Sequence, residues 1–163
     1  MNSDFIVAVH ALVFLNHKAS VVSSEALAEN VCTNAARVRK IMSPLKRAGF
    51  VETREGNEGG YRFIVDPATV DLAAVAKALE VTFVEARWHS GDADKECLVA
   101  SGMAGIMDEI FYELDAGCRM RLKNITIASI DKDIFGTGDV ATHSDIGEAA
   151  AQSNAGSAAA PSA

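Results

Sequence analysis

The pattern of apolar and polar positions is clearest between residues 23 and 63. Apolar side chains recur there with the i, i+3, i+4 and i+7 spacing of a helix that buries one face. They are Val38, Ile41, Met42 and Leu45. Thr33 can cap this helix and Gly49 can end it. A shorter apolar run at 26–31, preceded by Ser23 and Ser24, predicts a short helix just before it.

Two strands are predicted after these helices, at 50–53 and 61–65, because apolar and polar residues alternate there. The linker between them reads EGNEGG, and its glycines supply the positive-φ positions that a hairpin needs. Helix, turn, basic helix and hairpin in this order predict a winged helix-turn-helix, with the hairpin as its wing.

The residues before this unit predict a buried helix over 1–16. Positions 5–15 contain only one polar residue, His10. Eleven residues are too few for a bilayer span, which needs about 20. We find no basic stretch and small-residue cleavage site of the kind that marks a signal peptide.

The residues after the wing predict three more helices. A short amphipathic helix starts at Val70 or Asp71 and runs to residue 80, and the pattern then lapses into a loop over 82–96. The longest helix is predicted over 101–123, with one apolar stripe that either packs in the core or forms a seam with a partner. The stripe consists of Met103, Met107, Ile110 and Leu114. A last helix is predicted over 126–135, with Thr126 as its cap and Ile127, Ile130 and Ile134 inward.

These elements predict a mainly α fold with a small β-hairpin. We divide the chain into a winged helix-turn-helix domain at 1–66 and a helical region at 67–135. Residues 136–163 are mostly Ala, Ser, Gly and Thr. Such a segment buries too little apolar surface to offset its ordering entropy, so we expect a disordered tail.

Positive charge is concentrated on the second helix and the hairpin. Residues 33–62 contain seven Lys and Arg against three Glu, a local balance of +4 in a chain of net charge −7. A localised positive patch on an acidic protein is typical of a phosphate-binding surface. The alternative is a solvated basic helix on an ordinary α+β domain.

The ordered set of motifs resembles the Rrf2 family of bacterial transcription regulators. The resemblance rests on the run TNAARVRKIMSPLKRAGFVETREGNEGGYRF, then DLAAVAKALE, ECLVASG and ITIASID, and covers about residues 2–135. It implies a winged helix-turn-helix that binds double-stranded DNA. It also implies that the stripe on the long helix is the seam of a homodimer.

We expect the start of the second helix to lie nearest the bases, as in other helix-turn-helix proteins. Thr33, Asn34 and Arg37 are therefore candidate base contacts, and Arg37 has the bidentate geometry that suits guanine. Further candidates for phosphate contacts are Arg39, Lys40, Lys46, Arg47, Arg54 and Arg62.

Two positions depart from the usual pattern. Pro44 lies inside the predicted second helix, where a missing N–H predicts a kink or an early stop. Relatives in this family carry arginine before the first wing glycine, whereas Glu55 stands there in this chain and Arg54 precedes it. Strand alternation sends these two side chains to opposite faces, so we expect Arg62 to supply the wing's phosphate contact.

The cysteines do not follow the pattern of a metal site. Many family members hold an iron-sulfur cluster with three closely spaced cysteines before the long helix, but this chain has only Cys97 there. Cys32 and Cys118 lie elsewhere, and one cysteine with His89 does not complete a cluster. We predict no cluster and no other cofactor. The alternative is a cluster that bridges two subunits through both Cys97 thiolates and non-cysteine ligands, for which the resemblance suggests Asp4, although hard carboxylates match a soft iron-sulfur centre poorly. Acidic neighbours at 92, 94 and 96 disfavour a Cys97 thiolate, so we expect an inert thiol, with a redox sensor as the alternative.

Together these observations predict a cytoplasmic homodimeric repressor that binds a pseudo-palindromic operator. Three unpaired cysteines and no export signal are typical of a reducing compartment. We expect any signal to be a small molecule between the wing domain and the long helix. An enzyme with Cys97 as nucleophile lacks a base partner. A winged-helix adaptor that binds protein is the remaining alternative class.

Overall fold

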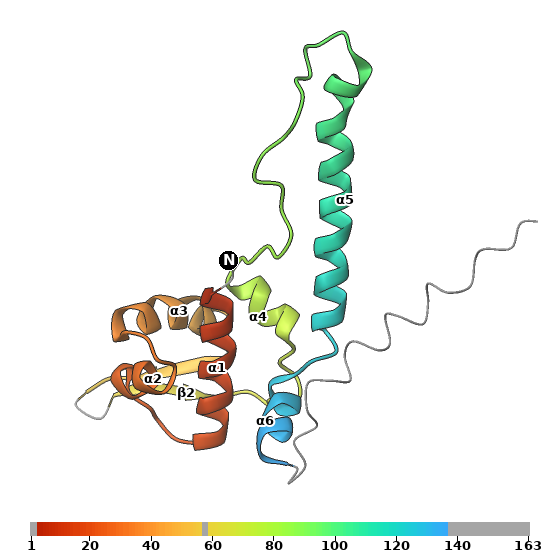
Figure 1. Cartoon of the computed structure of the whole chain (residues 1–163). Coiled ribbons are helices and arrows are strands. Elements are labelled where there is room, and N and C mark those ends of the chain that lie inside the picture. The colour runs from red at the N-terminus through yellow and green to blue at the C-terminus, as the bar shows by residue number, and fades with distance from the viewer. Residues whose placement is uncertain (1–2, 57–58, 137–163) are drawn as a thin grey trace, which may run out of the picture.

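The computed structural model describes residues 3–56 and 59–136, which form six helices and one two-stranded antiparallel sheet (Figure 1). This confirms the predicted mainly α fold with a small hairpin. The elements are α1 (Ser3–Lys18), α2 (Ser24–Asn30), α3 (Ala35–Arg47), β1 (Val51–Arg54), β2 (Gly60–Phe63), α4 (Leu72–Ala78), α5 (Leu98–Leu122) and α6 (Ile127–Phe135).

Helices α2 and α3 form the helix-turn-helix, and side chains cap both of them. Ser23 caps α2 as predicted, with its hydroxyl accepting from the Ala26 N–H at 3.1 Å. The predicted cap of α3 is wrong by one residue: Asn34, not Thr33, is the N-cap, and its Oδ1 accepts from the Arg37 N–H at 2.8 Å. The reason is local, because the Thr33 N–H donates to the Ala28 carbonyl and so belongs to the turn after α2.

Of the two outcomes predicted for Pro44, a kink or an early stop, the early stop is wrong, because α3 continues through it to Arg47. The kink stays a prediction. Proline has no N–H to donate to the preceding turn, but its carbonyl still accepts from the Ala48 N–H at 2.9 Å. The last turn of the helix is therefore closed. Gly49 then ends the helix with a φ of 79°, a left-handed conformation that favours glycine.

The hairpin is attached to the helices by a third stretch of extended chain. Val51 pairs with Phe63, and Arg54 with Gly60. Val22 exchanges two backbone hydrogen bonds with Tyr61, at 2.8 and 2.9 Å. At Gly60 a Cβ would overlap the Val22 carbonyl, so this close approach needs glycine.

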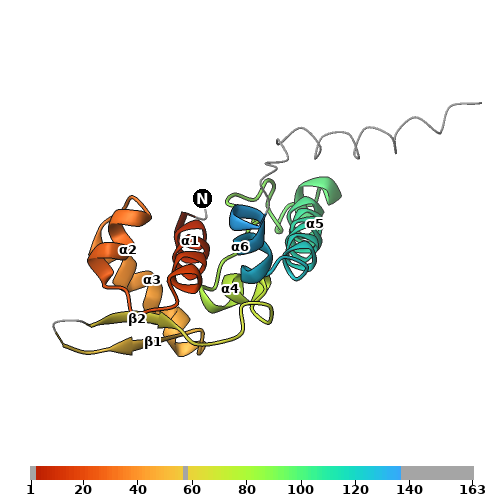
Figure 2. The ribbon, with the colours of Figure 1, turned by 90° about the horizontal axis from the view of Figure 1, so that it is seen from below.

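A single core joins α1, α2, α3, β1, α4 and α6. Helix α1 lies between the helix-turn-helix on one side and α6 on the other (Figure 2). Leu12 and Leu15 of α1 are fully buried, as is Ile127 of α6. The segments before α4 and α6 are joined by a bridge between Asp71 and Thr126, and Thr126 caps α6 as predicted. Ile134, however, is 58% exposed and not inward, because it lies in the last turn of α6.

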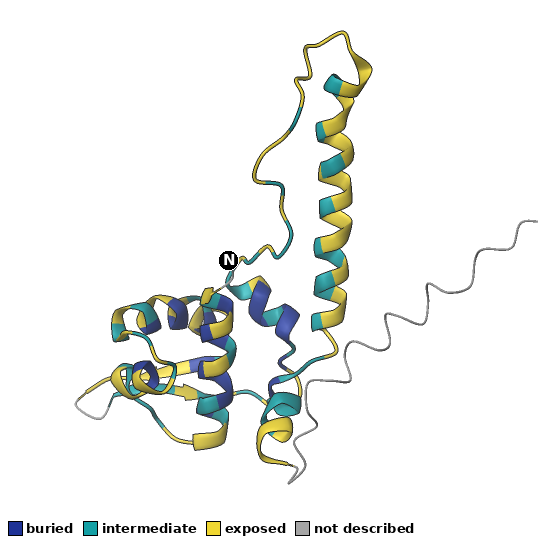
Figure 3. Cartoon of the chain, viewed as in Figure 1, coloured by how far each residue is buried: buried dark blue, intermediate teal, exposed yellow. Residues whose placement is uncertain are grey.

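Helix α5 stands apart from this core. It begins at Leu98, three residues earlier than predicted, and none of its 25 residues is buried (Figure 3). Residues 79–97, which we call the connector, form no helix or strand and run beside α5 (Figure 1). One chain therefore does not cover its longest helix.

The predicted tail lies outside the described residues except for Gly136. None of the described helices combines the length and the apolar character that a membrane crossing requires.

Candidate nucleic-acid interface

Helix α3 presents a polar face on the side opposite its buried one. The buried residues are Val38, Ile41, Met42 and Leu45, and the helix carries five basic and no acidic side chains. The positions on the opposite side follow the same helical spacing and are all exposed. They are Ala36, Lys40, Ser43 and Arg47. Sequence reasoning missed Ala36 and Ser43, although the phase of the apolar stripe was sufficient to find them.

Arg37, the predicted guanine contact, points to the flank of this face. Its Nε and Nη2 donate to Asp4 Oδ1 at 3.0 and 2.6 Å, and its Nη2 also donates to the Ser3 hydroxyl at 2.7 Å. The guanidinium is thus held against the start of α1. Asp4 is a residue of the interface that the charge pattern alone does not reveal.

The other predicted cations of α3 are exposed. Arg39 donates to Ser24 at 2.9 Å and forms an ion pair with Glu25 at 3.2 Å. Lys46 Nζ donates to the Thr53 hydroxyl at 2.6 Å, which ties α3 to β1. Arg47 donates to Ser43 at 3.0 Å. Within the described residues Lys40 makes no ion pair, so its ammonium faces solvent freely.

At the start of α3, Thr33 is half-buried and Asn34 is exposed. The cap hydrogen bond uses the side-chain oxygen of Asn34, Oδ1. The side-chain nitrogen of Asn34 therefore stays available as a donor. Both residues flank the positive end of the helix, where N–H groups suit a phosphate.

The wing carries its charge on the outer face of the hairpin. Glu52 pairs with Arg62 across the strands, and their side chains form an ion pair at 2.7 Å. Arg54 and Glu55 are both exposed. Burial raises the pKa of the neighbouring Tyr61 phenol, with a smaller opposing effect from Arg39.

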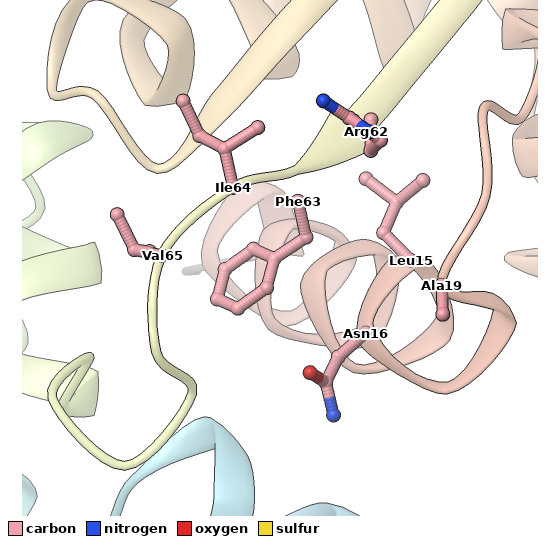
Figure 4. Close-up of a pocket in the computed structure, with 7 residues that line it drawn as sticks. All are labelled: Leu15, Asn16, Ala19, Arg62, Phe63, Ile64 and Val65. Atoms are coloured by element: carbon pink, nitrogen blue, oxygen red, sulfur yellow. The ribbon is translucent and has the colours of Figure 1, made fainter.

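Two pockets of about 360 Å³ lie against α1. The first opens between the end of α1 and the strand β2 (Figure 4), and Arg62 stands at its edge. Its lining is Leu15, Asn16, Ala19, Arg62, Phe63, Ile64 and Val65. The second is an apolar groove between α1 and α6, lined by Phe5, Ile6, Val9, His10, Val13, Leu72, Ile130 and Ile134. The predicted effector site between the wing domain and α5 stays a prediction.

The predicted dimer residues lie along one side of α5. Met103, Ile110 and Leu114 are exposed, and Met107 is half-buried. Their role in a dimer stays a prediction. Ile106 is 57% exposed and lies beside the exposed members of this set. The outer stripe, as we use the term below, consists of Val99, Met103, Ile106, Ile110 and Leu114.

Asp115, a half-buried carboxylate of α5, bonds to the backbone of the connector. Asp115 accepts from the N–H groups of Phe83 and Val84 at 2.7 and 3.2 Å and pairs with Arg119 at 2.7 Å. Arg119 also donates to the Val81 carbonyl. Burial raises the pKa of Asp115, but the Phe83 N–H, Arg119 and the Val84 N–H together bring the pKa below its ordinary value.

Asp115→Asn is expected to lower the free energy of unfolding by about 1–3 kcal/mol at neutral pH, because it weakens these charged hydrogen bonds. A lowered pKa means that the stabilisation is complete above the ordinary carboxyl pKa of about 3.9 and is lost as pH falls through the folded-state pKa. Urea unfolding at a series of pH values should therefore show the difference between wild type and variant shrinking in acid.

The matched control is Asp108→Asn on the same helix. Asp108 is exposed and pairs with His89 at 2.7 Å, so its loss should cost less than about 1 kcal/mol. Equal losses for the two variants, or a difference between wild type and Asp115→Asn that does not change with pH, would contradict the role given to Asp115.

Cys97 is the N-cap residue of α5, and its thiol is exposed. The N–H groups of Ala100 and Val99 lower the pKa of this thiol. This direction is opposite to the one expected from the acidic neighbours at 92, 94 and 96. Its role as a redox thiol stays a prediction.

Comparison with known proteins places the chain in a family. A model of the Rrf2 family, described as iron-dependent transcriptional regulators, matches residues 1–133. The YwnA protein of Bacillus subtilis (strain 168), a candidate HTH-type transcriptional regulator, is 27% identical over 135 residues, which are 83% of this chain and 99% of YwnA.

Solved structures share the fold. A candidate transcriptional regulator from Lactobacillus plantarum superposes with a TM-score of 0.71 at 27% identity, over 82% of this chain and 91% of that one. IscR of T. potens has a TM-score of 0.61 at 17% identity, over 83% of this chain and 88% of that one. CymR, the global cysteine regulator of B. subtilis, has a TM-score of 0.58 at 18% identity, over 79% and 93%.

The iron in the family description can be tested against the donors of this chain. Cys97 and Cys118 are 21 positions apart at the start of α5 and along it, a rise of about 30 Å. Cys32 lies in the turn of the helix-turn-helix. Among the described residues no three His, Cys, Asp or Glu side chains gather to hold a metal ion. The described donors of one chain do not fit an iron centre, and the absence of a cofactor stays a prediction.

The family model covers residues 1–133 of the 163, and the fold agrees over 82% of the chain. The winged-helix fold is what these solved structures and this chain have in common. The protein belongs to the Rrf2 family of transcriptional regulators.

Proposed function

We propose that this protein is a DNA-binding transcription regulator that acts in the cytoplasm as a homodimeric repressor on a pseudo-palindromic operator. The observation that carries the proposal is the exposed face of α3. It is continuous, polar and without acidic residues, although the whole chain has a net charge of −7. A face of this kind suits the major groove of DNA. We assign the protein no catalytic activity.

Residues on this surface divide into two groups by position. Lys40 and Ser43 lie at the centre of the exposed face and are proposed to meet base edges, together with Arg37 once it leaves Asp4. This proposal replaces the expectation from sequence that Thr33 and Asn34 meet bases and that Lys40 meets a phosphate. The surrounding groups are proposed to hold phosphates, which position the protein without reading sequence. These are Thr33, Asn34, Arg39, Lys46, Arg47, Arg54 and Arg62.

The outer stripe of α5 supports the homodimer. Its apolar side chains are about half exposed in one chain, and burying the exposed part of each against a second copy would contribute about 1 kcal/mol. A two-fold dimer that places two α3 helices about one DNA turn apart, roughly 34 Å, would need an operator with matching half-sites.

The proposal is tested by selecting bound sequences from random duplex DNA and measuring variants on the selected operator. Lys40→Ala is expected to cost about 1–3 kcal/mol and to relax the preference at one base pair per half-site. Arg47→Ala should weaken all sequences alike and reduce the salt slope by about 1.

Lys132→Ala is the matched control, because this exposed lysine lies on α6, on the other side of α1 from α3 (Figure 2). It should change neither affinity nor sequence preference. If no sequence were enriched, or if Lys40→Ala behaved like the control, the proposed surface would be wrong.

For the signal we propose a small molecule, with redox sensing through Cys97 as the second candidate. The exposed position of this thiol at the start of α5 and its lowered pKa favour the second candidate. Cys97→Ser should abolish a response of operator binding to peroxide if the thiol is the sensor, and leave it unchanged if it is not.

A further inference from the structure

Three arginines of the proposed DNA-binding surface are each bonded to a carboxylate of the same chain. The pairs are Arg37–Asp4, Arg39–Glu25 and Arg62–Glu52. DNA phosphates would have to compete with these carboxylates for the same N–H groups. The surface is therefore partly neutralised by its own side chains before any DNA arrives.

The pair between Arg37 and Asp4 differs from the other two. It joins α1 to α3 across 33 residues of sequence, and Arg37 makes three hydrogen bonds there, two to Asp4 and one to Ser3. Arg37 is also the least exposed of the three arginines, with 34% of its side chain accessible. The other pairs are open surface contacts, which contribute little.

Asp4 is held in place by the core. It lies in the first turn of α1, and the next residue, Phe5, is buried. The Phe5 ring makes a T-shaped contact with Phe83 of the connector, with ring centroids 5.2 Å apart. Because the backbone of Asp4 belongs to a packed helix, its carboxylate stays where Arg37 meets it.

We propose that Asp4 is a specificity-determining residue, which withholds Arg37 from DNA of arbitrary sequence and releases it to the operator. This inference rests on the proposed function. A lone phosphate accepts hydrogen bonds from Arg37 much as Asp4 and Ser3 already do, so it gains little by replacing them. A guanine placed opposite Arg37 by the operator sequence accepts two hydrogen bonds in a bidentate contact. Asp4 thus lowers non-specific affinity by removing one cation from the surface that arbitrary DNA meets.

A double-mutant cycle tests this with four proteins: wild type, Asp4→Asn, Arg37→Gln and the double variant. Asn keeps the size of Asp and removes its charge. Affinity for a random-sequence duplex is measured over a range of salt concentrations. Asp4→Asn is expected to raise this affinity by about 3- to 10-fold at low salt and to steepen the salt slope by about 0.9, the value for one additional phosphate contact.

Arg37→Gln leaves the Asp4 carboxylate unpaired and should lower the non-specific affinity slightly, whereas its salt slope and that of the double variant should equal the wild-type slope. If Asp4→Asn steepened the salt slope equally with and without Arg37, the effect would be one of net charge and the inference would fall. It would also fall if Asp4→Asn changed neither affinity nor slope.

The same cycle in urea, without DNA, measures whether the two side chains interact in the free protein. A coupling of zero overturns the inference whatever happens on DNA. If coupling is present but none of the four proteins binds DNA, the proposed function fails and the inference falls with it. If the wild type binds DNA and only the effect of Asp4→Asn is missing, the inference alone is overturned.

Discussion

Ile110→Asp is expected to convert the protein to a folded monomer and to reduce operator affinity by about 100-fold or more. Ile110 lies at the centre of the outer stripe of α5 and is 42% exposed in one chain, so the change costs a single chain little. In the proposed dimer it would bury an unpaired charge, at about 3–5 kcal/mol. At 1.4 kcal/mol for each tenfold, this corresponds to a loss of at least two orders of magnitude.

Sedimentation velocity gives the oligomeric state, and circular dichroism shows whether the monomer is folded. Tyr112→Asp is the matched control, because Tyr112 lies on the same helix, is 77% exposed and points about 200° away from Ile110. This variant should remain dimeric. A wild-type protein that sediments as a monomer and still binds an operator would refute the proposed dimer.

Ile41→Ala is expected to lower the free energy of unfolding by about 2–5 kcal/mol. Ile41 is 2% exposed and lies on the inner face of α3, within the core. Removing its side chain leaves a cavity that the surrounding helices fill only in part. Urea or thermal unfolding measures the loss.

Ser43→Ala, two positions further along α3, tests the opposite face of the same helix. Ser43 is exposed, so its loss should change stability by no more than about 0.5 kcal/mol. If Ile41→Ala and Ser43→Ala lowered the free energy of unfolding by similar amounts, α3 would be rotated about its axis from the position described. Lys40 would then not lie on the DNA-binding face.

Local patterns predicted most of the fold. The apolar spacing of α3 placed its buried face, and Ser23 and Thr126 were recognised as caps because a cap bonds to a backbone group three residues away. The assignment failed where two capping residues stand side by side. Thr33 and Asn34 are both suitable, and only the bond between the Thr33 N–H and the Ala28 carbonyl decides between them.

The outer stripe of α5 was predicted in part for a similar reason. Spacing alone groups Met107 with Met103 and Ile110, since all three are apolar and a turn apart. In the structure Met107 is half-buried and Ile106 is exposed, so the exposed stripe is not the one that spacing alone selects. A stripe of apolar residues predicts that one side of a helix is buried. It does not predict which residues of the stripe pack against the same chain and which stay exposed.

The sequence by itself determined the helix-turn-helix, the hairpin, the concentration of positive charge and the family. These depend on residues a few positions apart, whose spacing follows from the period of a helix or a strand. Only the tertiary structure decided that Arg37 is held by Asp4, because α1 packs beside α3 and brings together two residues that are 33 positions apart. The charges of both residues can be read from the chain, but their contact depends on how the two helices pack.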